Sequence, residues 1–180
     1  MMWDWARVEL FNDTGYIFKL ESYMDYKIRE LKQNEISVLN TFLYEAIFIP
    51  DGVEAPTYEI INQPELQVYV TDFGKKKGDI CYVSECDNKI VGAVWVRIMD
   101  DYGHVDDETP SFAISLLKEY RNYGIGTELM KRMISELKKQ GYKQASLSVQ
   151  KRNYAFHMYF KLGFVIIDEN EEEYIMLCKL

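Results

Sequence analysis

The run from Arg121 to Gly126, Arg-Asn-Tyr-Gly-Ile-Gly, contains what a backbone needs to hold an anion. It lies between an alternating apolar segment, residues 112–117, and a stretch with helical spacing that follows Gly126. Two glycines let a chain approach an anion without interference from a Cβ atom. The free N–H groups at a helix start then point at the anion, reinforced by roughly half a positive charge from the helix dipole. The run therefore predicts a bound pyrophosphate.

The spacing around these glycines disfavours two common classes of nucleotide site. A dinucleotide-binding fingerprint needs a third glycine at the position of Leu129. A Walker loop needs Lys and then Ser or Thr after its last glycine, whereas Gly126 is followed by Thr127 and Glu128. What remains is Arg/Gln-x-x-Gly-x-Gly/Ala between a strand and a helix.

That pattern resembles the acetyl-CoA loop of the GNAT superfamily of N-acetyltransferases. A second motif strengthens the resemblance: residues 153–155, Asn-Tyr-Ala, and residues 159–164, Tyr-Phe-Lys-Leu-Gly-Phe, are similar to the family's Asn-x-Ala and Tyr-x-x-x-Gly-Phe. Two motifs at this separation are far more specific than one. The clear resemblance covers about positions 80 to 180.

The resemblance implies a fold, a co-substrate and a set of site residues. The fold is of the α/β (α+β) class: a mixed, mostly antiparallel central sheet flanked by helices, with a local parallel pair splayed at the acetyl-CoA site. Acetyl-CoA is the implied co-substrate, and no metal is implied. The implied cofactor-binding positions are Leu116, Leu117, Arg121, Asn122, Tyr123, Gly124, Ile125, Gly126, Thr127 and Asn153.

The resemblance also assigns two steps of the chemistry. A backbone N–H around Leu116 would stabilise the oxyanion that forms when an amine attacks the thioester. Tyr159 would protonate, or donate a hydrogen bond to, the departing thiolate. The alternative role of Tyr159 is that of an aromatic anchor on an amphipathic helix, and Asn153 can also act as a helix N-cap.

An acceptor amine must lose a proton before it can attack. With a pKa near 10.4, only about one lysine-like amine in 2,500 is neutral at pH 7. The acidic cluster of residues 106–108 precedes the strand that leads into the loop, and Glu108, thirteen residues before Arg121, resembles the base position of histone-type members. We expect Glu108 as the base, with Asp107 second. The alternative is an exposed turn closed by Thr109 and Pro110.

The surrounding periodicity indicates the elements that carry these residues. Residues 80–83 and 90–98 alternate as strands on either side of a turn, and residues 145–149 alternate again after Gly141, a helix stop. Between the loop and Gly141, the apolar side chains form one helical stripe: Leu129, Met130, Met133, Ile134 and Leu137. The succession of strand, helix, strand, helix and strand predicts a mixed sheet with local parallel pairing.

The first half of the chain is expected to hold a helix and a long loop. Asn34 resembles an N-cap for a helix that reaches residue 47. Residues 51–77 are predicted to form a loop with short ordered pieces, either covering the acceptor, as in related enzymes, or serving as a surface connection. Trp95 and Arg97 share one face of their strand. They are either a wall of the acceptor site or a packed indole and a snorkelling surface arginine.

The N-terminus has two interpretations. Residues 6–11 and 16–21 flank Asn-Asp-Thr-Gly at 12–15 and could form a hairpin. Residues 26–29 are predicted to be the first strand of an acetyltransferase, so residues 1–23 are an extension or an over-extended start, and 24–180 a single N-acetyltransferase domain.

Composition restricts the partners. The chain has 180 residues, 48% of them hydrophobic, and a formal net charge of -8. This charge disfavours nucleic acid and suits a cationic acceptor. No apolar run reaches the length of a membrane span, and Asp4, Glu9 and Asp13 disfavour a signal peptide, so we expect a cytoplasmic protein. Cys81, Cys86 and Cys178 lack zinc-site spacing and are expected to be reduced structural thiols.

Two functional hypotheses follow. The first is direct transfer of the acetyl group of acetyl-CoA to a primary amine on a small molecule or peptide, base-assisted and without a covalent enzyme intermediate. The second is a catalytically silent acyl-CoA-binding sensor or regulatory module. The pair Glu108 and Tyr159 favours catalysis. Relatives are often dimers, so the resemblance also allows a homodimer.

Overall fold

The computed structural model describes residues 9–11, 17–19, 24–50 and 52–180. In this part of the chain the strands and α-helices are β1 (Glu9–Phe11), β2 (Ile17–Lys19), β3 (Lys27–Glu30), α1 (Leu39–Ala46), α2 (Pro64–Gln67), β4 (Ile80–Cys86), β5 (Lys89–Arg97), β6 (Ser111–Leu116), α3 (Ile125–Lys139), β7 (Gln144–Gln150), α4 (Phe156–Lys161), β8 (Val165–Glu169) and β9 (Glu173–Lys179). From β6 to β8 the elements follow the predicted succession of strand, helix, strand, helix and strand.

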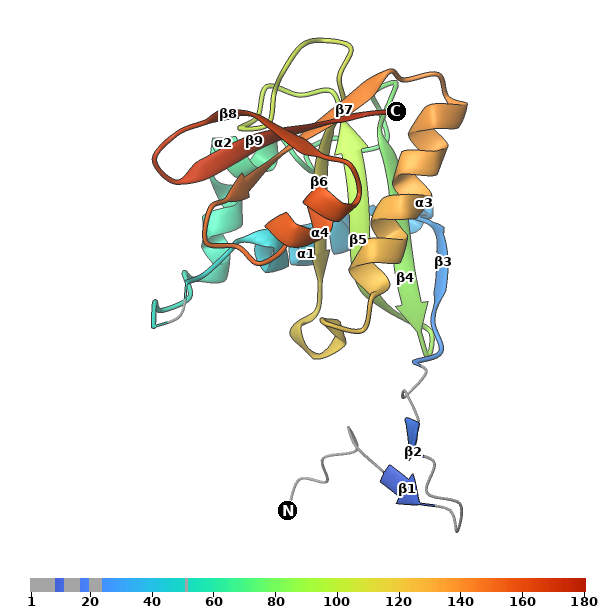
Figure 1. Cartoon of the computed structure of the whole chain (residues 1–180). Coiled ribbons are helices and arrows are strands. Elements are labelled where there is room, and N and C mark those ends of the chain that lie inside the picture. Colours follow the sequence, from blue (N-terminus) through green and yellow to red (C-terminus); the bar gives the residue numbers. More distant parts are fainter. Residues whose placement is uncertain (1–8, 12–16, 20–23, 51) are drawn as a thin grey trace.

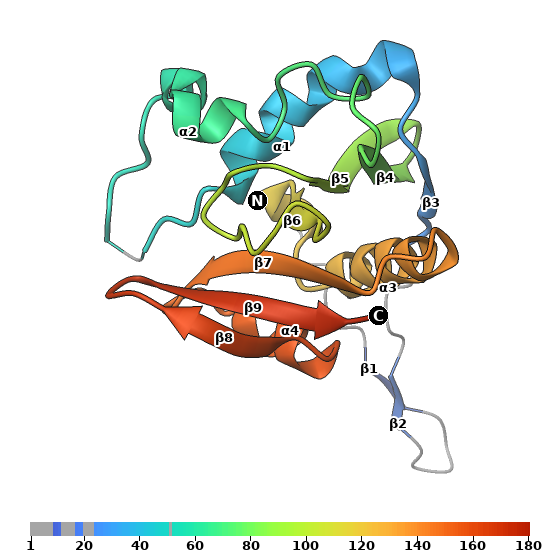
Figure 2. The same ribbon diagram turned by 90° about the horizontal axis from the view of Figure 1, so that it is seen from above.

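The main sheet has the strand order β3-β4-β5-β6-β7-β9-β8. Its neighbouring strands pair antiparallel except for β6 and β7, which are parallel. Figures 1 and 2 show α1 and α2 on one side of the sheet and α3 on the other. This arrangement confirms the mixed, mostly antiparallel fold expected from the sequence.

Strand β5 shows why the sheet needs helices on both faces. Ala93 and Trp95 pack in a core cluster with Phe42 of α1, whereas Val94 and Val96 pack in a second cluster with the apolar stripe of α3. These four β5 side chains are 0% exposed. Because successive strand residues point to opposite faces, a strand that is apolar at every position must be covered twice.

Helix α3 follows its predicted stripe. Leu129, Met130, Met133 and Leu137 are all 0% exposed. Gly141 has a φ of +86°, and the N–H of Tyr142 donates to the carbonyl of Leu137 at 3.1 Å, so the glycine ends the helix as expected. None of the helices in the described part of the chain, α3 included, has the length and apolar character of a bilayer-spanning helix.

The predicted start of the first helix is wrong. Helix α1 begins at Leu39, and Asn34 lies inside a preceding 3₁₀ turn, Gln33–Val38. The turn is held instead by Glu35, whose carboxylate accepts the backbone N–H of Lys32 at 3.0 Å and pairs with Arg29 at 2.7 Å. The carboxylate of Glu35, paired with Arg29 of β3, thus holds the start of the turn in place of the expected Asn34 cap.

The strands near the N-terminus match two of the sequence expectations, whereas the assignment of residues 1–23 to an extension stays a prediction. β1 pairs antiparallel with β2, as the proposed hairpin requires, and the turn at 12–15 lies outside the described residues. β3 pairs antiparallel with β4 and is the edge of the main sheet. The three cysteines are free and buried, as expected for structural thiols.

The segment after α1 consists of short pieces: a 3₁₀ turn at Tyr58–Asn62 and helix α2. Buried side chains of β5 hold its backbone. Trp95 donates to the carbonyl of Tyr69 at 3.1 Å, and Arg97 donates to the carbonyls of Val68 at 2.8 Å and Thr71 at 2.9 Å. The packed indole predicted for Trp95 is confirmed.

The snorkelling arginine predicted at position 97 is wrong. Arg97 is 1% exposed and forms a salt bridge of 3.0 Å with Asp79, which is equally buried. A buried guanidinium needs a carboxylate and hydrogen-bond acceptors, and the folded segment 68–79 supplies both. Arg97 is therefore an anchor for this segment.

Candidate active site

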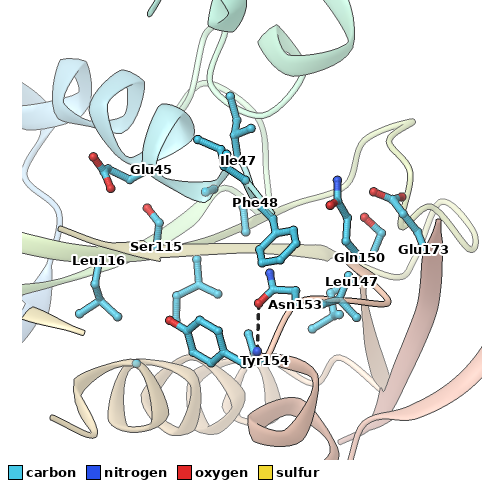
Figure 3. Close-up of a pocket in the computed structure, with 18 of the residues that line it drawn as sticks. Glu45, Ile47, Phe48, Ser115, Leu116, Leu147, Gln150, Asn153, Tyr154 and Glu173 are labelled. Carbon is cyan, nitrogen blue, oxygen red and sulfur yellow. Dashed lines mark hydrogen bonds between the residues drawn. The ribbon is translucent and has the colours of Figure 1, made fainter. Parts of the chain in front are cut away.

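A large cavity opens where β6 and β7 separate. The two parallel strands pair only at Ser111 and Ser146, supported by a hydrogen bond of 3.0 Å from the Ser146 N–H to the Pro110 carbonyl. Beyond this point the strands diverge, and residues 112–116 and 147–150 line opposite sides of a cavity of about 1170 Å³. Figure 3 shows Ser115 and Leu116 on one wall and Leu147 and Gln150 on the other.

The divergence leaves the backbone N–H of Leu116 facing the cavity side of β6. In an antiparallel ladder, N–H groups point alternately toward and away from the partner strand. The Leu117 N–H donates to the carbonyl of Val91 in β5 at 2.9 Å, so the Leu116 N–H points away from β5. No pairing with β7 covers this position. Leu116 thus presents a donor where the sequence predicted an oxyanion contact.

The glycine loop presents a row of donors at the start of α3. Gly124 is the N-cap, with a φ of +81° that suits glycine. Within the described part of the chain, no backbone N–H from position 123 to position 127 donates a hydrogen bond to another backbone group. With the dipole of a fifteen-residue helix behind them, these groups fit a phosphate.

Gly126 has a second role that the sequence did not reveal. A Cβ atom at this position would lie 3.2 Å from Cδ1 of Leu116, and one at Gly92 would lie 2.8 Å from Cδ2 of the same leucine. The Leu116 side chain therefore fills the space between two glycines. Gly126 lets the start of α3 pack closely on β6, in addition to leaving room for an anion.

Arg121 lines the cavity and ties the loop to α1. Its side chain donates to the carbonyl of Leu116 at 3.0 Å and forms a salt bridge of 2.8 Å with Glu45. The guanidinium is thus held by Leu116 and Glu45 at the start of the glycine loop. Its predicted support of the diphosphate stays a prediction.

Tyr159 and Asn153 come from α4 and the turn before it. Tyr159 lines the cavity, is 8% exposed, and has a pKa raised mainly by burial and further by Tyr154. Asn153 accepts the N–H of Ala155 at 2.9 Å, the bond drawn in Figure 3, and so braces the turn that leads into α4. A tyrosine is ordinarily protonated at neutral pH, and burial makes ionisation of Tyr159 still less favourable.

The structure gathers most of the predicted cofactor positions in this cavity. Its lining includes Leu116, Arg121, Asn122, Gly124, Gly126, Thr127, Asn153 and Tyr159. Three predicted positions are not among the lining residues. Tyr123 is exposed and the side chain of Ile125 is buried, which leaves backbone contact as their contribution. Leu117 uses its N–H for Val91 and its carbonyl for Tyr120, so its backbone is already engaged.

The two acids expected to supply the base lie elsewhere. Asp107 and Glu108 are exposed in the turn before β6, where the Glu108 N–H donates to Asp106 at 2.9 Å. The cavity is lined by Tyr102, before this turn, and by β6 from Phe112 onward, and no residue of the turn is among the lining residues. The structure therefore does not bring Asp107 or Glu108 to the cavity, because they precede the amino end of β6 while the cavity opens along the rest of the strand.

The far end of the cavity has acidic and aromatic residues from four distant segments. Phe48 follows α1, Tyr69 follows α2, Tyr102 follows β5, and Glu173 begins β9. Tyr69 belongs to the segment 51–77 that the sequence suggested as an acceptor cover, whereas sequence reasoning missed the other three. The run of acids at 171–173 was the available signal, although no motif connected it to the site.

Two carboxyl groups at this end have raised pKa values. Burial raises the pKa of Asp101, whose carboxylate accepts hydrogen bonds from Tyr69 at 2.8 Å and Ser111 at 2.7 Å. Burial, and then the charges of Glu172 and Asp101, raise the pKa of Glu173. Among the described residues, no group of three or more His, Cys, Asp or Glu side chains is arranged to hold a metal ion.

Comparisons with known proteins agree with this geometry. The sequence model described as "Acetyltransferase (GNAT) family" matches residues 47–164. Over 68 residues the chain is 34% identical to the ribosomal protein bS18-alanine N-acetyltransferase of Haemophilus influenzae, an alignment that covers 38% of this chain and 47% of that protein. The chain thus spans less than half the length of this curated relative.

Solved structures share the fold. The PaiA N-acetyltransferase from Thermoplasma acidophilum, in complex with coenzyme A, aligns with a TM-score of 0.65 and 20% identity over 87% of this chain and 100% of that one. The ribosomal-protein-S18-alanine N-acetyltransferase from Escherichia coli aligns with a TM-score of 0.60 and 17% identity over 86% of this chain and 94% of that one. At these identities the likeness shows the fold alone.

Proposed function

We propose that this chain, which belongs to the acetyltransferase (GNAT) family, transfers the acetyl group of acetyl-CoA directly to a primary amine. The observation that carries the proposal is the convergence of three features in one cavity. These are the unpaired loop N–H groups at the start of α3, the Leu116 N–H at the splay, and the buried Tyr159 hydroxyl.

The loop end of the cavity would bind the diphosphate of acetyl-CoA. Its donors are backbone N–H groups, which keep their positions whatever the side chains do. Arg121 would add a charge-assisted hydrogen bond at the rim, and Asn153 would contact the pantetheine arm or the diphosphate. Both side chains line the same cavity as the glycines, which supports these roles.

The thioester would lie where β6 and β7 diverge, at a place where the amine can reach its carbonyl carbon. The amine nitrogen forms a C–N bond to this carbon, and the oxyanion that develops is stabilised by the Leu116 N–H. The C–S bond then breaks, and the electron pair leaves on sulfur. The nitrogen loses two protons in all and the thiolate gains one, so each turnover releases one proton.

Tyr159 would donate to the departing sulfur. A tyrosine has an ordinary pKa of about 10 and is protonated at neutral pH, and burial raises the pKa of Tyr159 further. A thiol has a pKa of about 8.5, well below that of such a phenol, so full proton transfer from Tyr159 to the thiolate is uphill. A strong hydrogen bond that stabilises the thiolate is the better-supported role.

The acidic end of the cavity would receive the amine. Glu171, Glu172 and Glu173 line it, and Lys118 and Arg121 are the basic residues in the lining, both close to the glycine loop in sequence. This division of charge favours a positively charged acceptor at the end remote from the diphosphate. We therefore propose a cationic small molecule or peptide with a primary amine as the acceptor.

Release of free thiol from acetyl-CoA tests this function. The purified protein is mixed with acetyl-CoA and a panel of polyamines, aminoglycosides, small metabolites and peptides with free N-termini, with acetyl-CoA binding measured in parallel. We expect release that depends on the acceptor and is fastest with cationic amines. Tight acetyl-CoA binding with no release from any amine would contradict transfer and favour an acyl-CoA sensor.

A further inference from the structure

Direct transfer leaves one role unassigned, that of the group that removes the proton from the acceptor. Within the described part of the chain, the carboxylates that line the cavity are Glu45, Glu171, Glu172 and Glu173. Neither His104 nor His157 is among the lining residues, and His104 contacts the carbonyl of Met99 at 2.9 Å. The base must therefore be sought among these four acids.

Three of these four carboxylates are poorly suited to act as the base. Glu45 forms a salt bridge of 2.8 Å with Arg121, near the glycine loop. Glu171 and Glu172 are exposed to solvent, where a carboxylate keeps little basicity. Glu173 is half-buried, and its side chain forms no hydrogen bond or ion pair within the described residues.

The backbone of Glu173 is firmly held. It begins β9 opposite Gln150, the last residue of β7. Its N–H donates to the Asn170 side chain at 2.7 Å, and its carbonyl accepts the N–H of Asn170 at 3.0 Å. Figure 3 shows its carboxylate pointing from β9 toward the side chain of Gln150 at the edge of the cavity. A fixed backbone thus presents a carboxylate without a protein partner.

We propose that Glu173 is the base that takes the proton from the acceptor's ammonium group, directly or through one water, and that Asp101 is its positioning residue. This inference rests on the proposed acetyl transfer. Asp101 is close enough for its charge to raise the pKa of Glu173, and one of its carboxylate oxygens is held by Tyr69 and Ser111. Its other oxygen, Oδ1, is buried and has no hydrogen-bond partner among the described residues.

The charges around Glu173 make it more basic than an exposed carboxylate. Glu172, in the turn before β9, and Asp101, in the segment after β5, both raise its pKa, after the larger effect of burial. The Tyr69 hydroxyl is engaged by Asp101, and the pKa of this phenol is raised, so it stays neutral. Lys151 directs its ammonium to Glu169 at 3.1 Å. Lys151 is thus engaged elsewhere, and among the described residues no cationic side chain forms an ion pair with Glu173.

The proton balance is simple. The ammonium N–H bond breaks, its proton moves to the Glu173 carboxylate, and the freed lone pair attacks the thioester carbon. Glu173 then returns its proton to solvent before the next turnover. Because the base works only when ionised, activity must rise with pH through the Glu173 pKa.

Steady-state kinetics of Glu173→Gln test this assignment, with Glu169→Gln, an exposed carboxylate of β8 outside the cavity lining, as the control and Glu108→Gln as the sequence-based alternative. We expect Glu173→Gln to lower kcat/KM for the amine about 100-fold and to remove the rise with pH. The acetyl-CoA dissociation constant should stay within about twofold, because Glu173 lies away from the glycine loop. Both control variants should keep the wild-type rate within about threefold.

Asp101→Asn provides an independent readout. Removing its negative charge lowers the pKa of Glu173, so the rise in activity should move to lower pH, a shift that loss of packing alone would not produce. If Glu173→Gln keeps the wild-type rate and pH profile, the assignment of the base is overturned but the proposed transfer is not. A large loss of kcat/KM in Glu108→Gln would overturn the assignment of the base in the same way. Absence of thiol release by the wild-type protein with every amine would overturn the proposed transfer, and the base with it.

Discussion

The two ends of the cavity are built in different ways. At the loop end, the candidate donors are the backbone N–H groups from position 123 to position 127, which belong to one continuous stretch of chain. At the acidic end, the lining side chains come from four separate segments. Backbone donors suit a co-substrate that does not change, whereas side chains can be replaced one at a time to suit an acceptor.

The acidic end also depends on supports outside the cavity. Trp95 and Arg97 do not line it, yet they hold the backbone on either side of Tyr69. The loop end is supported by Arg121, through its salt bridge to Glu45 and its hydrogen bond to the Leu116 carbonyl. Changes in these supports should therefore separate acceptor binding from acetyl-CoA binding.

The largest effect is expected when the support of the acidic end is broken. Asp79→Ala leaves the Arg97 guanidinium buried without its carboxylate, and should lower the free energy of unfolding by about 3–5 kcal/mol. Urea unfolding measures this. Lys75→Ala, which breaks the exposed pair with Asp72, should cost less than about 1 kcal/mol. Equal losses in the two variants would show that burial of the Arg97 pair is unimportant.

Tyr159→Phe should separate chemistry from binding at the junction of the two ends. Loss of the hydroxyl should lower kcat about 100-fold, while the acetyl-CoA dissociation constant stays within about twofold. Tyr154→Phe is the matched control, since Tyr154 also lines the cavity but is 61% exposed. A large loss of acetyl-CoA affinity in Tyr159→Phe would remove Tyr159 from a role in transfer.

Gly126→Val should affect the loop end specifically. Its Cβ would start 3.2 Å from Leu116, and its methyl groups would crowd the anion site. We expect acetyl-CoA binding to weaken at least tenfold, about 1.4 kcal/mol, by calorimetry. Gly141→Ala, with a φ of +86° and open space around it, should lower stability by about 1 kcal/mol without changing this affinity. Similar affinity losses in both would contradict a local effect.

Arg121→Ala should have the smallest effect. We expect acetyl-CoA binding to weaken about threefold to tenfold at low salt, and the difference from wild type to shrink at high salt. Titrations at two ionic strengths measure it. An unchanged dissociation constant would remove Arg121 from the diphosphate site and leave its salt bridge to Glu45 as its role.

The contrast between the two ends also explains what the sequence could predict. The glycine loop, the apolar stripe of α3 and the stop at Gly141 follow from local spacing, and the structure has them as predicted. The error about Arg97 has a different origin. Its partner, Asp79, is eighteen residues away, and only the folded segment before β4 brings the carboxylate under β5.

The choice of a candidate base shows the same limit of prediction from local spacing. Glu108 was selected by its distance along the chain from Arg121, but that distance does not say at which end of β6 the carboxylate lies. Glu173 reaches the cavity because β9 inserts between β7 and β8 in the sheet, an order that no local pattern encodes. Strand order, more than residue type, decided which acid lines the cavity.

Comparison of released thiol with acetylated amine, both counted in one reaction, tests the central claim most directly. Cationic primary amines are mixed with acetyl-CoA and the protein, free thiol is followed by absorbance, and the product amine is counted by mass spectrometry. Direct transfer to an amine at the acidic end predicts one acetylated amine for each thiol, with unmodified protein at the end. Thiol release without acetylated amine, or an acetyl group left on the protein, would contradict the account.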